Sequence, residues 1–120
     1  LSYDTEYFQH ILAITRFLSY KTPKEITMDY MSYQQGWEVT KFKKMGRDLI
    51  QLVEIEDQNK RTLRMVGDLK ANAALKDRYF NNFISTLENS GLFESVKVIF
   101  QNSKANMGSD RLQFEIKCII

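Results

Sequence analysis

The sequence predicts an α+β domain in which one antiparallel sheet carries two helices on the same face. Apolar residues recur at helical spacing in two stretches, one ending before Pro23 and the other before Gly91. The remaining apolar stretches alternate with polar residues, which is typical of half-buried strands. Because each expected strand has only one strongly apolar side, both helices should cover that side.

Size and composition indicate one ordinary globular domain over residues 1–120. A chain of this length can bury its own core, and a hydrophobic share of 43% with 27% charged residues is usual for such a domain. The net charge of +2 gives too weak a field to recruit nucleic acid or anionic lipid. No apolar run reaches the roughly 18–20 residues that span a bilayer. The chain begins at Leu1 without a methionine, so we expect it to be a fragment of a longer protein.

The first helix is expected to begin at Asp4, a suitable N-cap, and to end at Thr22, because the residue before Pro23 avoids the helical region. A strand should follow from Ile26, since apolar and polar residues then alternate. The apolar face of this helix comprises Tyr7, Phe8, Ile11, Leu12, Thr15 and Leu18.

An extra hairpin is expected at about residues 34–60. Gln34–Gly36 has the composition of a turn, Trp37–Thr40 that of a short strand and Leu49–Ile55 that of a strongly apolar strand. Asp57–Lys60 is expected to form another turn. The basic turn between the two strands of this hairpin surrounds Gly46 and contains Lys41, Lys43, Lys44 and Arg47.

The second half repeats the helix-and-strands pattern. Thr62–Leu69 should be a strand, and a helix should run from about Asn72, its N-cap, to about Asn89. Gly91 is expected in the left-handed conformation that ends helices, with the next two apolar residues folding back onto the helix. The apolar stripe of this helix comprises Leu75, Tyr79, Phe80, Phe83, Ile84 and Leu87.

Two strands should complete the sheet, separated by a polar loop from Asn102 to Ser109. One carries Val96, Val98 and Phe100 at alternate positions, and we expect Val98 to be buried in the core. The other has the cleanest alternation in the chain, with Leu112, Phe114, Ile116 and Cys118 facing inward. Apart from the extra hairpin, the predicted order is αββαββ.

Several of these pieces occur in this order in one known family. They are the helix running into Pro23, the strand from Ile26, Leu63-x-Met65-x-Gly67, the helix from Asn72 to Leu87, Leu87-x-x-Ser90-x-Leu92-Phe93-x-x-Val96, and Phe114-x-Ile116. Together they cover about three-quarters of the chain. In this order the chain resembles the periplasmic domain of the PilN-like fimbrial assembly family. The relatives of that family include the platform proteins L and M of type II secretion. Residues 34–60 depart from the family pattern because they are longer than its usual connection.

The resemblance implies a circularly permuted ferredoxin-like fold. It also implies an upstream part with a cytoplasmic tail, one transmembrane helix and a coiled coil, which places this domain in the periplasm of a bacterium. Proteins of this kind form a homodimer or a heterodimer with a sister protein of similar fold and contact other platform proteins. The resemblance brings no catalytic residues, cofactor or metal.

The residues themselves offer little chemistry. His10 is the only histidine and is expected at the surface of the first helix, without the positioned partner that a general base needs. Cys118 is expected to be a core thiol, and as a single cysteine it excludes an internal disulfide. Glu54, Glu56 and Asp57 cluster at a strand end, where solvation is a simpler interpretation than a metal site.

The basic turn allows a second interpretation, because positive charge beside Trp37 and Phe42 could bind single-stranded nucleic acid. The aromatic pattern of an RNA-recognition sheet is absent, however, so a solvated hairpin tip is the favoured interpretation. Exposed aromatic and methionine residues are enriched at protein interfaces. The expected partner interface is Tyr30, Met31, Tyr33 and Trp37, although these residues could equally cover the sheet.

The sequence therefore favours a non-enzymatic interaction domain of the inner-membrane assembly platform of a type IV pilus or a type II secretion system. It would act by pairing with itself or with a similar sister domain. The alternative is a ferredoxin-like module that binds a ligand or nucleic acid. A third interpretation, an acylphosphatase-like enzyme, lacks the expected glycine-rich phosphate loop with its arginine.

Overall fold

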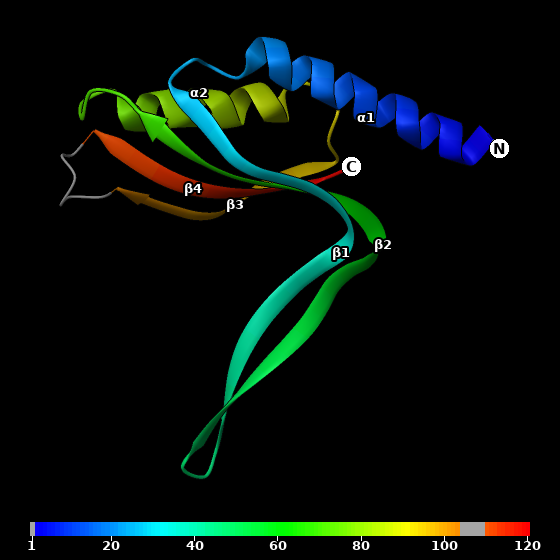
Figure 1. Cartoon of the computed structure of the whole chain (residues 1–120), viewed down its shortest axis with the longest axis vertical. Coiled ribbons are helices and arrows are strands. Elements are labelled where there is room, and N and C mark those ends of the chain that lie inside the picture. Colours follow the sequence, from blue (N-terminus) through cyan, green and yellow to red (C-terminus); the bar gives the residue numbers. More distant parts are fainter. Residues whose placement is uncertain (1, 104–109) are drawn as a thin grey trace.

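The computed structural model describes residues 2–103 and 110–120, with side chains from residue 5 onward, and the elements within them follow the predicted order αββαββ (Figure 1). These elements are α1 (Ser2–Lys21), β1 (Ile26–Met45), β2 (Asp48–Lys70), α2 (Lys76–Glu88), β3 (Ser95–Ser103) and β4 (Arg111–Ile119).

The strands form one antiparallel sheet in the order β1-β2-β4-β3, so the last strand of the chain lies inside the sheet. Both helices lie over the same face, and the opposite face carries no helix (Figure 1). The predicted α+β class, with a four-stranded antiparallel sheet and two helices on one face, is confirmed.

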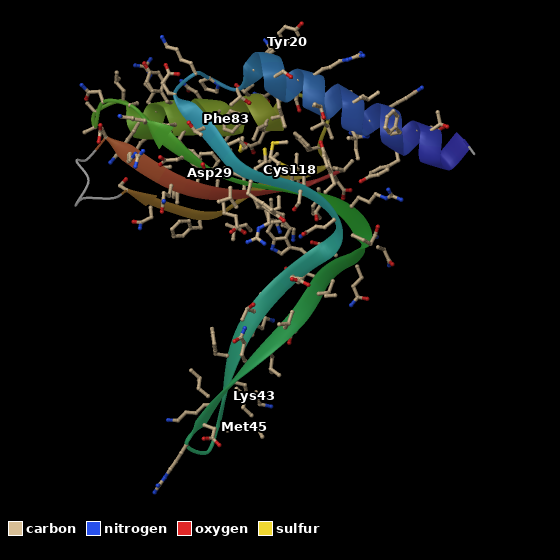
Figure 2. All side chains as sticks on the ribbon, viewed as in Figure 1. Tyr20, Asp29, Lys43, Met45, Phe83 and Cys118 are labelled. Carbon is tan, nitrogen blue, oxygen red and sulfur yellow. The ribbon has the colours of Figure 1, made fainter. Side chains whose placement is uncertain are left out.

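The core lies between the helices and the two central strands. Alternation in β2 and β4 directs their apolar residues toward the helices, as predicted for β4. The Phe114 ring lies 5.3 Å from the ring of Phe80 and 6.5 Å from that of Phe83. Figure 2 shows Phe83 and Cys118 in this layer. The buried core cluster comprises Ile14, Leu18, Ile26, Leu63, Met65, Leu69, Phe80, Phe83, Leu87, Leu112, Phe114, Ile116 and Cys118.

Gly67 provides the space for the Phe114 ring. The two residues are opposite each other in the β2–β4 register. A Cβ atom on Gly67 would lie 2.7 Å from Cζ of Phe114 and 2.7 Å from the carbonyl oxygen of Thr27. Phe114 can therefore hold its place in the core only because the facing residue has no side chain.

The helix termini correct two expectations. α1 begins at Ser2, so Asp4 lies in its first turn and is not an N-cap; its side chain is outside the described residues. α2 begins at Lys76, and Asn72 instead stabilises the preceding turn, where its Oδ1 accepts a hydrogen bond of 2.9 Å from the Ala74 amide. The left-handed Gly91 after α2 is confirmed, with φ at +74°.

β3 differs from its prediction. A register irregularity at Ile99 sets Val98 opposite Ile116 but Phe100 opposite Glu115. The extra residue turns Phe100 to the face without helices, so Val96, Val98 and Phe100 do not share one face. Val98 is 38% exposed because β3 is an edge strand. The predicted loop overlaps β3 at Asn102 and Ser103, and the rest of it, residues 104–109, lies outside the described residues.

β1 and β2 extend far beyond the sheet. They have 20 and 23 residues, whereas β3 and β4 have 9 each. The surplus residues, 37–56, pair only with each other and project as a two-stranded arm (Figure 1). The predicted turn at the basic residues is confirmed as the arm's tip, Gly46–Arg47. The predicted chain reversals at 34–36 and 57–60 are wrong, because both strands continue through them.

Truncating a core side chain should destabilise the domain strongly. Leu87 is fully buried in the helix–sheet core, so we expect Leu87→Ala to lower the free energy of unfolding by about 2–5 kcal/mol in urea denaturation. Val98→Ala, on the exposed edge strand, is the control and should cost clearly less. Equal losses would show that the edge strand is packed as tightly as α2.

Adding a methyl group at Gly67 should also be costly. Gly67→Ala forces Phe114 away from its place, with an expected loss of about 1–3 kcal/mol. Combining it with Phe114→Leu should recover part of that loss, which a double-mutant cycle measures as a coupling energy. Strictly additive losses would contradict the contact.

Candidate functional site

The bend between the sheet and the arm is the most unusual place in the molecule. Within the sheet, the β1–β2 register runs as far as Gln35 opposite Arg61, and it resumes in the arm with Trp37 opposite Glu56. Four residues of β2, Asp57–Lys60, therefore face only Gly36 of β1. Such a surplus on one strand bends a hairpin. Together the sheet and the arm form an L that measures 50 × 48 Å and is 20 Å thick.

Gly36 is required at the bend for two reasons. Its φ is +75°, and an added Cβ would lie 2.7 Å from Cγ2 of Ile55. Asp57 also has a positive φ, 51°, which aspartate tolerates better than most residues. Two side chains hold the bend together: Thr62 Oγ1 donates to the Gly36 carbonyl at 2.7 Å, and Gln35 Nε2 donates to the Gln58 carbonyl at 2.8 Å.

A buried ammonium group connects the bend to the sheet. Lys117 on β4 has a side chain that is only 3% exposed, although it points to the face without helices. Its Nζ donates to Asp57 Oδ2 at 2.7 Å and lies 3.9 Å from Glu56 Oε2. The same Nζ is 5.1 Å from the centre of the Trp37 ring, within the range of a cation–π contact.

A second cation lies beside the same tryptophan. Arg64 Nη2 donates to Glu115 Oε1 at 3.0 Å, and its Cζ lies 5.7 Å from the Trp37 ring centre. Trp37 is only 5% exposed. At the arm's base the ring of Trp37 therefore packs against two cations of the sheet, Lys117 and Arg64. Beside them lies a hollow of about 450 Å³ that Lys97 and Ile99 also line.

The ionisable groups are paired within this framework. The hydrogen bond from Lys117 holds the pKa of Asp57 below its ordinary value of 3.8. On the arm, the hydrogen bond of 2.8 Å to Glu54 raises the pKa of Lys41. Lys60, beside the bend, is paired with Glu94. The predicted carboxylate cluster is therefore divided: Glu54 pairs with Lys41, whereas Glu56 and Asp57 lie beside Lys117.

The residues considered for catalysis have structural positions. Burial raises the pKa of the Cys118 thiol to about 12, so it is a core residue as predicted. His10 is half-buried, and its Nε2 lies 2.7 Å from the Leu92 carbonyl, which connects α1 to the segment after α2. Across residues 2–103 and 110–120, no three histidine, cysteine or acidic side chains are grouped so as to hold a metal ion.

The four residues expected at a partner interface do not form one surface. Tyr30 and Trp37 are on the side of the sheet without helices, where Tyr30 is exposed and Trp37 is buried at the bend. Met31 and Tyr33 face the helices, and burial raises the pKa of Tyr33. Only Tyr30 and Met31 remain widely accessible to a partner.

Arg64 and Lys117 were not predicted as site residues, because alternation places both on a polar strand face, where charged residues are common. A signal was nevertheless present. Lys117 lies in the strongly apolar end of β4, where a buried cation requires partners.

The arm exposes most of its apolar side chains. They lie on both of its faces, and beyond the base, where Trp37 packs against the sheet, no element of the described chain covers either face. The exposed apolar residues of the arm are Phe42, Met45, Leu49, Ile50, Leu52, Val53 and Ile55.

Comparison of the chain with protein-family models, curated proteins and solved structures gave no match. Neither described helix combines the length and the apolar character needed to cross a membrane.

Removing the carboxylate of Asp57 should change how stability depends on pH. The pKa of Asp57 is lowered in the folded state, so its contribution is present above the unfolded value and is lost as the pH falls through the folded value. We expect Asp57→Asn, which keeps a residue tolerant of positive φ, to melt at a lower temperature than the wild type at pH 7. The gap should begin to close as the pH falls below the ordinary value of 3.8 and should disappear once the pH has fallen through the lowered folded value.

Glu54→Gln is the matched control, since it removes the same charge from an exposed pair on the arm. It should hardly change the melting temperature. A gap for Asp57→Asn that stays constant from pH 7 to pH 3 would show that the effect is not ionic.

Proposed function

We propose that this domain is a structural component of a bacterial inner-membrane assembly platform, either of a type IV pilus or of a type II secretion system. It would work by pairing with a second copy or with a sister domain of similar fold, and not by catalysis. In this role it would lie in the periplasm, connected to the membrane by an upstream helix.

The finer fold assignment that goes with this proposal is a circularly permuted ferredoxin-like domain. Moving the first strand of a βαββαβ unit to its C-terminal end gives αββαββ. The order of elements, the single helical face and the interior position of β4 support this assignment.

The residues on which the family resemblance depends lie in the framework of the fold. Met65 and Leu87 are core residues, and Gly67 makes room for Phe114. They therefore support a shared architecture and say less about a shared partner. The choice of a pilus or secretion platform depends on the resemblance in sequence.

The observation that carries an interaction role is the projecting arm. Soluble domains rarely expose apolar residues over a whole element unless that element meets a partner. The outer edge of β3 is a second surface that a strand of a similar domain could extend, with Val98 and Ile99 exposed on it. A domain with two such surfaces can link other proteins geometrically, which is what an assembly platform requires.

The proposal predicts a specific phenotype. Deleting the gene in its native host should abolish surface pili or the secretion of folded exoproteins, and the wild-type gene supplied in trans should restore them. A variant lacking residues 38–55 of the arm should be present at normal levels and yet fail to restore the function. Normal pili and normal secretion in the deletion strain would overturn the assignment.

The nucleic-acid alternative is tested separately with purified protein. Four basic residues at the arm's tip would have to carry it, and acidic residues follow them on β2. If single-stranded RNA binds in a salt-dependent way and a variant with Lys41, Lys43, Lys44 and Arg47 replaced by glutamine does not bind it, the alternative is favoured.

A further inference from the structure

The arm has two distinct faces. The inner face carries Trp37, whose ring packs against the sheet, and includes Val39, Lys41, Lys43, Leu52 and Glu54. The outer face consists of Glu38, Thr40, Phe42 and Lys44 on β1 and Leu49, Gln51, Val53 and Ile55 on β2. All eight of these residues are exposed, so the domain's own body does not cover this face. At the arm's base, Glu38 and Thr40 also line the hollow beside Lys97.

The outer face exposes apolar side chains to solvent, which is unfavourable unless a partner covers them. Phe42 and Leu49 are 64% and 68% exposed, and Val53 and Ile55 are also largely exposed. A two-stranded ribbon with no third layer has little stability of its own in water. A partner that covers these side chains would therefore stabilise the arm as well as bind it.

Two charges on this face identify the partner. Glu38 near the arm's base and Lys44 near its tip are its only charged residues, three positions on either side of Lys41. They are about 20 Å apart along the strand, too far to pair with each other. Neither forms an ion pair with any residue that the structure describes. On the inner face, by contrast, Lys41 and Glu54 form an ion pair, with 2.8 Å between Nζ and Oε2.

We propose that the outer face binds the outer face of a second copy of this chain, with the two arms antiparallel and related by a two-fold axis at the level of Lys41. This arrangement sets Glu38 of each arm against Lys44 of the other, forming two equivalent ion pairs. It also sets Ile55, level with Glu38, against the partner's Leu49, level with Lys44. Phe42 and Val53 fill the centre of the contact.

Parallel arms do not give this complementarity. They would place Glu38 over the partner's Ile55 and Lys44 over the partner's Leu49, which buries charges against apolar groups. A polyanion such as RNA would meet Glu38 on this face and would leave the apolar row uncovered. The charge pattern thus favours a second copy with antiparallel arms.

The contact should be weak when the chain is isolated. The outer face is about 20 Å long and about 10 Å wide, so its area is well below the roughly 800 Å² that each partner buries in a standard interface. We expect the dimer of the isolated chain to have a dissociation constant between about 10 µM and about 1 mM. Tethering at a membrane would shift the equilibrium further toward the dimer. This inference names a partner and a surface within the proposed function, and its test does not depend on which machine the domain serves.

The test is a charge reversal with rescue, measured by sedimentation equilibrium of the purified 120-residue chain. Lys44→Glu replaces each ion pair by a repulsion between two carboxylates and should weaken pairing by about tenfold or more. Glu38→Lys should do the same. The double variant Glu38→Lys/Lys44→Glu restores opposite charges and should recover most of the wild-type affinity.

The matched control is Lys43→Glu, which makes the same change one residue away on the inner face. It should leave pairing within about twofold of wild type, and circular dichroism should show all four variants to be folded, because these side chains are exposed. The inference is overturned if the wild type is monomeric at 1 mM, if Lys43→Glu weakens pairing as much as Lys44→Glu, or if the double variant fails to recover.

These outcomes are distinct from a failure of the proposed function. Pairing that survives Lys44→Glu but is lost in Val98→Lys would place the contact at the β3 edge, which overturns the arm contact and leaves the platform role in place. A deletion strain with normal pili and secretion would reject the platform role without affecting the charge-reversal result.

Discussion

The shape of this molecule depends on the burial of one ammonium group, that of Lys117. Taking a cation out of water is unfavourable unless anions and hydrogen bonds replace the water. The partners of Lys117 are Asp57, Glu56 and the ring of Trp37, and all of them belong to the bend of the long hairpin. They reach Lys117 only when the hairpin turns down over the face without helices. The same contacts therefore satisfy the lysine and fix the angle of the arm.

This coupling explains why the two halves of one hairpin behave so differently. Within the sheet, β1 and β2 have a helical layer on one side, and Leu63 and Met65 are fully buried. Beyond the bend no described element covers the same two strands except at the arm's base, and their apolar residues other than Trp37 and Val39 are exposed. Side-chain burial thus stabilises the first part, whereas the second depends on the contacts at its base and, in the proposed pairing, on the second copy that covers it. Gly36 marks the boundary between the two parts, because no other residue fits there.

The sequence was sufficient to predict an element where a single local pattern determines that element. The two helices (though not their first residues), the alternation of β4 and the left-handed Gly91 were predictable from local spacing and turn chemistry. The bend was not, because glycine and asparagine mark bulges as well as chain reversals. Nothing local indicates that Gly36 and Asp57–Lys60, which are 21 to 24 positions apart in the sequence, face each other from two strands. Likewise, one extra residue at Ile99 turns Phe100 to the other face, which alternation cannot reveal.

The candidate surface was harder to predict than the fold, since aromatic composition alone did not identify it. Trp37 seemed suited to a partner, yet it has two cations of its own chain beside its ring. The arm that Trp37 anchors carries the accessible surface instead, with residues that looked in sequence like an ordinary solvated tip. Because the arm stands away from the sheet, a partner on its outer face leaves the edge of β3 free. In the proposed arrangement, one small domain would hold a second copy of itself on its arm and a strand of a similar domain at the edge of β3. The buried lysine at the bend would set the distance between these two surfaces.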